Sequence, residues 1–318
     1  MVVRHRVLWP AIAVTVVMVL GTVTVEAKQR VAITDAASPD TGSIAIGSIV
    51  ATLAPVLATP RSIDTLTIAI QAIVASSGTS VGMALIELAA ATPVVRSVNG
   101  TEVFSAASTY KLAALMLEAE NIAVGTADPN GVVCFRPDDY ESGWFGDYAD
   151  GSCFTRNELA MRAGVYSDNT AGHMLVRDVG GAAELNAWAA AAGAIRSDFF
   201  EGNTTTPADL AALWLAEARG NLGGTAAQAW LYPVLTNTRT ESGVPAGVSG
   251  ATVVHKTGTI DLVENDAALV TSSAAGPYVL VVMTDGLGGS DGWQLIANLS
   301  ATVWQFESSR APAAVSPS

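Results

Sequence analysis

The sequence is poor in the side chains that bind metals and nucleic acids. Its 318 residues include only three His and two Cys, too few and too dispersed for a metal site. Lys and Arg together number 16 against 29 Asp and Glu, so the basic surface typical of nucleic-acid binding is missing. Charged residues make up 14% of the chain and apolar ones 50%, which is enough for one large core. We therefore expect a globular protein that uses no metal or other cofactor.

The N-terminus has the pattern of an export signal. A short basic region with Arg4 and Arg6 precedes an uncharged apolar run over residues 7–25, and Ala27 follows at the spacing of a cleavage site. The run is also long enough to stay in the membrane, so residues 1–27 are interpreted as a signal peptide or a membrane anchor. Either alternative predicts an exported protein that is secreted, held in the cell wall or tethered to the outer face of the plasma membrane.

Composition divides the rest of the sequence into three parts. Residues 28–61 are rich in Ala, Ser, Thr and Pro without periodicity, which indicates a flexible tether. Residues 62–307 carry the apolar patterns of helices and strands and predict one folded domain, which we expect to be monomeric. Residues 308–318 are expected to be a disordered tail.

Strand patterns lie at both ends of the predicted domain, with helix patterns between them. Strands are predicted at 80–88, 93–98, 102–104, 252–256, 267–272 and 277–284, and helices at 63–75, 111–123, 170–179, 182–192 and 291–306. Thr155 and Thr206 are predicted to cap two further helices. This order predicts an α+β fold: an antiparallel sheet assembled from both chain ends, flanked by helices, with an all-helical lobe beside it. A cleft between the two parts would hold the chemistry.

Cys134 and Cys153 flank a stretch rich in Gly, Asp and Tyr. In an exported chain a disulfide that closes this loop is the favoured interpretation. Two unpaired cysteines, acting as small apolar residues, are the alternative.

Ser108 and Lys111 are candidates for a nucleophile and its base. A spacing of three places both side chains on one face of a helix, one turn apart. A serine hydroxyl attacks only when a neighbour takes its proton, and a partly buried lysine can do so because burial disfavours the ammonium form. Negative charge at Ser108 is also favoured by the helix N-terminus. Alone, the pair is equally typical of a solvated helix start with a surface lysine.

Two further polar motifs follow. Ser167-Asp168-Asn169 lies between two predicted helices, where an ordinary helix cap is the alternative interpretation. Lys256-Thr257-Gly258-Thr259 ends a predicted strand, where the lysine and the hydroxyls could bind a substrate carboxylate and the glycine would leave room for substrate. The chain has only three lysines. The two outside the tether, Lys111 and Lys256, each fall within one of the three motifs.

The set Ser-x-x-Lys, Ser-Asp-Asn and Lys-Thr-Gly, in this order, resembles the class A β-lactamase and penicillin-binding protein superfamily. The resemblance covers residues 62–307 and implies a β-lactamase-like serine hydrolase that cleaves amides through an acyl-serine intermediate. A small molecule would be its substrate: a β-lactam, whose hydrolysis would confer antibiotic resistance, or a D-alanyl-D-alanine peptide.

The resemblance also implies a role for each motif residue. Ser108 would become acylated after Lys111 takes its proton, and Ser167 would pass a proton to the leaving nitrogen. Lys256 would orient the substrate carboxylate and tune Ser167. The oxyanion would be held by backbone N–H groups of Ser108 and Thr259.

Substrate contacts are implied in the same way. Asn169 would hold the amide side chain of the substrate, and Thr257, Gly258 and Thr259 would line the carboxylate subsite. Arg239 stands where similar enzymes place an arginine that reaches this subsite, although surface decoration explains it equally well.

The chain departs from class A enzymes in the loop that supplies the base for deacylation. These enzymes carry a Glu-x-x-Leu-Asn motif before a Thr-Thr-x-Pro cap, but residues 196–203 contain no such motif and the loop is much shorter. Glu201 is the only glutamate in it, and is either a substitute base or a solvated carboxylate. Since a general base contributes about 10²–10⁴-fold, we expect slow release of the acyl-enzyme unless another group substitutes.

Three functions are consistent with these observations. Likeness over the whole domain favours a class A-type β-lactamase, whereas the missing glutamate favours a DD-peptidase-like penicillin-binding enzyme. A third candidate, a protein that captures β-lactams without turnover, would not need a lysine beside the serine. A Ser-His-Asp site is a poor alternative, because His173 and His255 are expected to be structural and strand alternation turns His255 away from Lys256.

Overall fold

The computed structural model describes residues 62–89 and 92–310. The predicted export segment and tether lie outside the described residues. The predicted tail begins too early at residue 308, because the last helix continues to Ser309 and Arg310 donates to both carboxylate oxygens of Glu87. Within the described ranges, no helix combines the length and the apolar character needed to cross a membrane.

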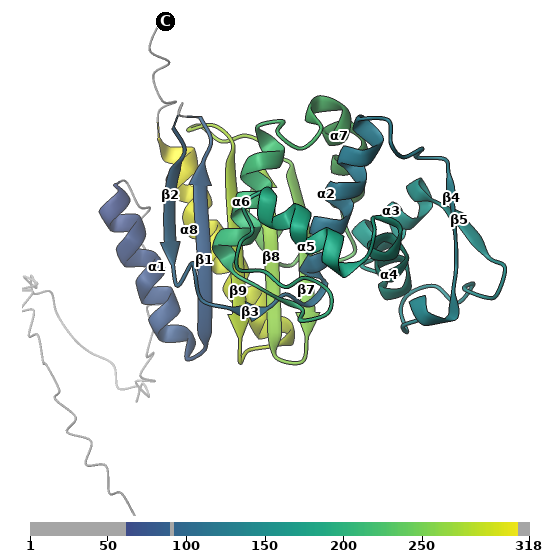
Figure 1. Ribbon diagram of the computed structural model, residues 1–318. Helices are drawn as coiled ribbons and strands as arrows, with labels where there is room; N and C mark the ends of the chain where they lie inside the picture. The colour runs from purple at the N-terminus through teal and green to yellow at the C-terminus, as the bar shows by residue number, and fades with distance from the viewer. Residues whose placement is uncertain (1–61, 90–91, 311–318) are drawn as a thin grey trace, which may run out of the picture. The chain divides into compact units, whose positions relative to one another are not determined.

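A five-stranded antiparallel sheet lies at the centre of the domain (Figure 1). Its order is β2-β1-β9-β8-β7, so strands from the two ends of the chain pair as β1 and β9, with Met83 opposite Val282. The predicted α+β sheet is therefore confirmed. The strands are β1 (Ser80–Glu87), β2 (Val94–Val98), β7 (Val253–Ile260), β8 (Val263–Val270) and β9 (Tyr278–Asp285).

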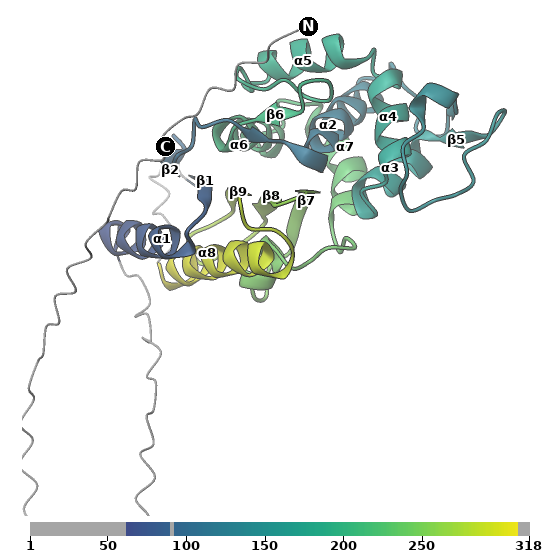
Figure 2. The same ribbon diagram turned by 90° about the horizontal axis from the view of Figure 1, so that it is seen from below.

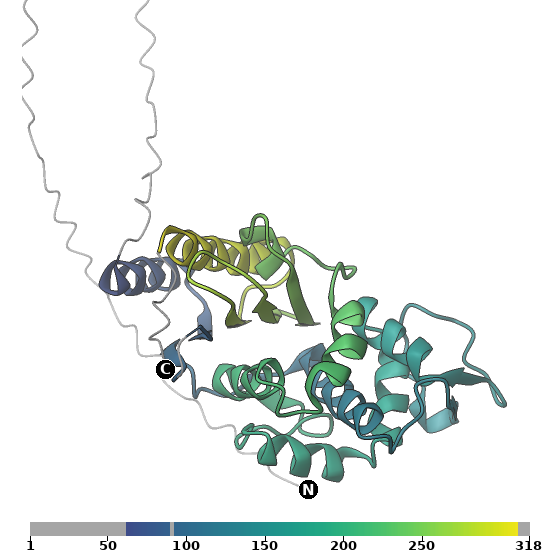
Figure 3. The same ribbon diagram turned by 90° about the horizontal axis from the view of Figure 1, so that it is seen from above.

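Helices cover both faces of this sheet. Successive side chains of a strand point to opposite faces, and in the central strand both sets are apolar and need to be buried. In β9, Leu280 and Val282 pack in a core with α1 (Ile63–Ser77) and α8 (Gly289–Ser309). Val281, in contrast, packs in the core on the opposite face. Figures 2 and 3 show α1 and α8 side by side in one layer, with the sheet between them and the other helices.

The second layer contains the predicted block of helices. Its helices are α2 (Tyr110–Ala123), α3 (Arg156–Val165), α4 (Asn169–Asp178), α5 (Ala182–Ala191), α6 (Pro207–Ala218) and α7 (Gly224–Leu231). α6 lies against β1, β8 and β9. The approach requires Gly82, since a Cβ there would lie 2.5 Å from the ring of Phe104 and 2.7 Å from Pro207. α2 is buried without interruption from Tyr110 to Ala119 and forms the centre of this layer.

Most predicted elements are present within a few residues of their expected bounds. The caps are confirmed: Thr155 accepts from the backbone N–H of Glu158, and Thr206 accepts from that of Asp209. The α7 helix was not predicted, nor was the ribbon of β4 (Val132–Cys134) and β5 (Cys153–Thr155). Short elements complete the fold: β3 (Phe104–Ser105), β6 (Thr204–Thr205) and the 3₁₀ turns Ala107–Thr109, Pro137–Asp139, Tyr232–Leu235 and Val244–Gly247.

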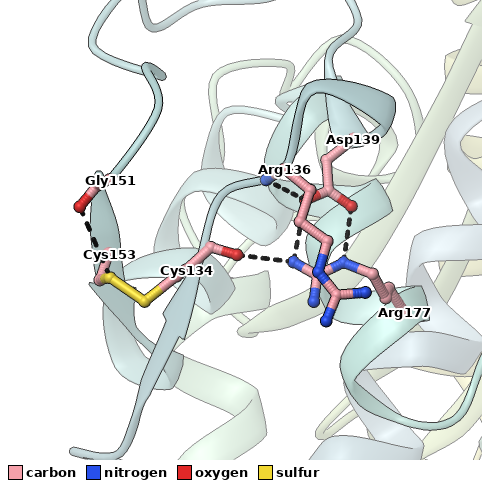
Figure 4. The surroundings of a disulfide bond; sticks show 6 residues. All are labelled: Cys134, Arg136, Asp139, Gly151, Cys153 and Arg177. Atoms are coloured by element: carbon pink, nitrogen blue, oxygen red, sulfur yellow. Dashed lines mark hydrogen bonds and ion pairs between the residues drawn. A yellow bond between two sulfur atoms is a disulfide. The ribbon is translucent and has the colours of Figure 1, made fainter.

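The predicted disulfide is confirmed and joins β4 to β5, where Cys134 and Cys153 face each other directly (Figure 4). Arg177 of α4 donates to the carbonyl oxygen of Cys134 and to both carboxylate oxygens of Asp139. The disulfide and this arginine together fix the loop between the two cysteines against α4.

Candidate active site

The predicted nucleophile lies in the turn that leads into α2. Ala107, directly before Ser108, has a φ of 45°, in the left-handed region that strains residues other than glycine. A Cβ on Gly258 would lie 2.8 Å from the carbonyl oxygen of Ala106 and 3.1 Å from the nitrogen of Ser108. This corrects the role predicted for the glycine, because the chain itself fills the space that was expected for substrate. Gly258 brings the edge strand β7 against the backbone of the nucleophile.

Lys111 is completely buried, and its amine points at Ser108. Its Nζ lies 2.9 Å from Oγ of Ser108, 2.7 Å from the carbonyl oxygen of Ser167 and 2.7 Å from Oδ1 of Asn169. Burial lowers the pKa of Lys111 to about 7, although the negative charges of Asp168 and Glu141 oppose this shift. A neutral amine has two N–H groups for the two acceptors and one lone pair for the serine proton. The geometry therefore suits Lys111 as the base.

Ser167 connects the two buried lysines. It has a φ of 58°, and its Oγ accepts from Nζ of Lys256 at 2.8 Å while its carbonyl oxygen accepts from Lys111. The pKa of Lys256 is lowered well below its ordinary value by burial and by the neighbouring charge of Lys111, against the pull of Asp266. The structure thus brings all four predicted catalytic residues into one continuous chain of hydrogen bonds.

The other two residues of the second motif have separate tasks. Asp168 caps α4 by accepting from the N–H of Ala171, as the alternative interpretation proposed, and it also accepts from Trp144 and Tyr148 of the disulfide-closed loop. Asn169 lies at the cleft. Its Nδ2 donates to Oε1 of Glu141 at 2.9 Å and to the carbonyl oxygen of Ser142 at 3.1 Å.

A polar pocket of about 240 Å³ opens on one side of Ser108. Arg239 is exposed and lies in this pocket, with its guanidinium 5.1 Å from the ring centre of Trp144. Thr259 was expected to donate its hydroxyl to a substrate anion. This expectation is corrected, because the hydroxyl donates to Glu264 at 2.6 Å. The lining includes Ser108, Ser167, Asn169, Arg239, Thr257 and Thr259.

A second pocket, of about 470 Å³, opens on the other side of Ser108. Its lining includes Tyr110, Glu141, Asn169, His173, Phe200 and Asn203. Glu201 is exposed and does not line either pocket beside Ser108, so its role as a deacylation base stays a prediction without support from the geometry. Glu141 is a residue of the site that the sequence does not predict, since its only signal is its place between the two paired cysteines.

The two histidines of the described chain differ from each other. His255 is completely buried, faces Asp266 at 2.9 Å and Glu241 at 3.1 Å, and is structural as expected. His173 lies at the second pocket and pairs with Glu141 at 2.9 Å. Between residues 62 and 310, gap excepted, no three His, Cys, Asp or Glu side chains gather as a metal site would require.

The fold and the site together define a serine hydrolase with a buried lysine 2.9 Å from the nucleophile. The model of the β-lactamase enzyme family matches residues 65–306, and the chain therefore belongs to that family.

Solved structures of this class resemble the chain over nearly their full length. It is 30% identical to PBP-A, covering 78% of this chain and 98% of that one at a TM-score of 0.71. A point mutant of PBP-A in an acyl-enzyme complex with penicillin G is 29% identical, over 77% and 97% of the chains at a TM-score of 0.71. PenP of Rhodopseudomonas palustris, a candidate class A β-lactamase, is 25% identical. The match covers 76% of this chain and 98% of that one, at a TM-score of 0.68. None of the curated protein sequences matched.

Proposed function

We propose that this serine hydrolase opens β-lactam rings through an acyl intermediate on Ser108. One observation carries the proposal: Ser108, Lys111, Ser167 and Lys256 form a single hydrogen-bonded chain beside two pockets. A serine oxygen next to a lysine with a pKa of about 7 is activated at neutral pH.

The reaction follows from this arrangement. Lys111 takes the proton of Ser108 as Oγ attacks the lactam carbonyl, and the backbone N–H groups of Ser108 and Thr259 stabilise the oxyanion. The C–N bond then breaks. Ser167 gives its proton to the leaving nitrogen and receives in exchange the proton that Lys111 took from Ser108, so that acylation moves one proton in total from Ser108 to the product nitrogen. Water must later hydrolyse the ester.

The substrate carboxylate would bind in the smaller pocket. The exposed guanidinium of Arg239 supplies positive charge in this pocket, and the hydroxyls of Ser167 and Thr257 supply hydrogen-bond donors. Asn169 would then face the amide side chain of the substrate.

A DD-peptidase-like activity on D-alanyl-D-alanine peptides is the second candidate. Two observations favour it: the 196–203 segment contributes no carboxylate to the lining of either pocket beside Ser108, and PBP-A is among the most similar structures. Both reactions share the acylation step and differ in what releases the acyl group.

One experiment separates these functions. The purified enzyme is mixed with a chromogenic cephalosporin, and colour and intact mass are followed together. Sustained turnover identifies a β-lactamase, whereas one equivalent of colour with a persistent adduct on Ser108 identifies a penicillin-binding enzyme. Release of D-alanine from a D-alanyl-D-alanine peptide would support the second function. A protein that shows no turnover and never carries the adduct is not a hydrolase of this type.

We also propose that the enzyme works outside the cytoplasm, either free or tethered through residues 7–25. Two observations support this proposal. An apolar segment follows a basic N-terminal region, and both cysteines of the chain are joined in a disulfide, which is typical of exported proteins. The mass of the protein recovered from its native host distinguishes a chain that begins near Lys28 from one that keeps its N-terminus.

A further inference from the structure

Class A enzymes have a water-activating glutamate in the loop that corresponds to residues 196–203. In this chain that segment contributes no carboxylate to the lining of the pocket. Glu201 is exposed there, while its neighbours Phe200 and Asn203 form the pocket wall. An ester on Ser108 nevertheless needs a base near a water if it is to be hydrolysed quickly. The pocket of about 470 Å³ is large enough for water, and Ser108, Asn169 and Asn203 make its wall polar.

A different carboxylate, that of Glu141, lines this pocket. Oε1 of Glu141 accepts from Nδ2 of Asn169 at 2.9 Å, and its Oε2 lies 2.9 Å from Nε2 of His173. Asn169 in turn accepts from Lys111, which contacts Ser108. One amide group therefore separates the carboxylate from the amine that activates the nucleophile. The negative charge of Glu141 is also among the influences that raise the pKa of Lys111 against the larger effect of burial.

Glu141 is held in place by its backbone as well as by its side chain. Its N–H donates to Oγ1 of Thr170 at 3.0 Å, and the Thr170 hydroxyl donates back to its carbonyl oxygen at 2.7 Å. Two residues earlier, Asp139 is clamped by Arg177 next to the disulfide (Figure 4). The side chain itself remains 53% exposed, so water reaches it. A fixed carboxylate with access to water is what a general base requires.

We propose that Glu141 is the general base of deacylation in this enzyme. This inference rests on the proposed function, since it concerns the ester that acylation leaves on Ser108. Glu141 takes a proton from a water in the larger pocket, and the water oxygen attacks the ester carbonyl. The bond between the carbonyl carbon and Oγ then breaks, the proton that Glu141 took from the water passes by way of Lys111 to Oγ, and the product leaves as a carboxylic acid, so that Glu141 is again a carboxylate.

The test separates acylation from deacylation in Glu141→Gln, with Glu201→Gln as the matched control. Each enzyme is mixed with benzylpenicillin, and the acylated fraction is followed by time-resolved intact mass, first in excess substrate and then after its removal. We expect deacylation of Glu141→Gln to fall by about 10²–10⁴-fold while acylation changes by less than about tenfold. Glu201→Gln should match the wild type in both steps. Added formate should partly restore deacylation in Glu141→Ala.

Other outcomes overturn the proposal in distinguishable ways. Deacylation at the wild-type rate in Glu141→Gln removes Glu141 from the reaction, and if acylation then becomes faster the carboxylate only occludes Asn169. A wild-type adduct that never decays shows that no base operates. A wild-type enzyme that neither forms the adduct nor turns over benzylpenicillin overturns the proposed function itself, and this inference with it.

Discussion

Burial lowers the pKa of both lysines of the cleft. Burial is the main reason that the pKa of Lys111 falls to about 7, and the pKa of Lys256 is lowered further by the neighbouring charge of Lys111. A pKa near neutrality lets Lys111 take a proton from Ser108 and give it up again within one reaction cycle. At the residue scale, activity thus depends on an amine kept away from water.

Replacing this amine should abolish acylation without unfolding the protein. In Lys111→Met we expect the acylation rate to fall by about 10²–10⁴-fold, because Ser108 loses the group that takes its proton. The free energy of unfolding should stay equal or rise, since a buried polar amine is replaced by an apolar chain of similar length. Stopped-flow acylation and urea denaturation measure the two effects, and acylation within tenfold of wild type would contradict the assignment.

The pH dependence of acylation should follow the same amine. Below its pKa of about 7, Lys111 is protonated and cannot accept the serine proton, so the rate should rise with pH through about 7 and then level off. The measurement is the single-turnover acylation rate between about pH 5 and pH 9. A profile that is flat or falls across neutrality would show that another group is the base.

At the scale of elements, the site is built where three segments of the chain meet. The turn before α2 supplies the nucleophile, the α3–α4 link supplies Ser167, and the edge strand β7 supplies Lys256. Their contact depends on small residues: Gly258 lets β7 reach the backbone of Ser108, and a Cβ on Gly172 of α4 would lie 2.6 Å from Cε of Lys111.

A single methyl group on β7 should therefore impair catalysis. Gly258→Ala pushes its Cβ against backbone atoms of Ala106 and Ser108, so we expect acylation to fall by about tenfold or more as the oxyanion donors move. Overpacking should also lower the free energy of unfolding by about 1–3 kcal/mol. Gly146→Ala is the matched control, since a Cβ there meets nothing within 4 Å. Equal acylation rates in the two variants would refute the role given to Gly258.

At the scale of the whole molecule, buried ionisable groups outside the cleft connect stability to pH. Burial raises the pKa of Glu118, Glu217 and Glu307 to about 7. For His255 burial acts in the opposite direction, but Asp266 and Glu241 outweigh it and raise the pKa to about 9. In each case the folded state binds protons more tightly than the unfolded chain does.

Through the three glutamates, stability should fall as pH rises from about 4.5 to about 7, whereas above about 7 the lowered pKa values of Lys111 and Lys256 act in the opposite direction to His255. The contribution of the glutamates is complete below their ordinary pKa of 4.5 and is lost by about pH 7, and that of His255 is complete below 6.5 and is lost by about 9. We expect the loss through the glutamates to be on the order of a few kcal/mol, measured by urea denaturation at several pH values. Glu217→Gln, far from the cleft in sequence and contact, should flatten the slope below pH 7. An unchanged slope would contradict the linkage.

The sequence by itself determined those features that depend on neighbours along the chain. The caps at Thr155 and Thr206 follow from short-range hydrogen bonds, and the strand and helix patterns follow from local periodicity. Three short motifs identified the reaction class because each keeps its chemical groups within a few residues. The pair of cysteines in an otherwise cysteine-free chain indicated the disulfide.

Only the tertiary structure decided what depends on burial and on residues far apart in the chain. β8 begins at Val263, earlier than predicted, because its polar residues Glu264, Asn265 and Asp266 find buried partners that a local pattern does not reveal. A local pattern likewise does not reveal that Thr259 donates to Glu264, or that Glu141 reaches the cleft from the disulfide-closed loop. Hydrogen bonds between distant residues, and the loss of water around them, set these roles, and a local sequence pattern contains neither.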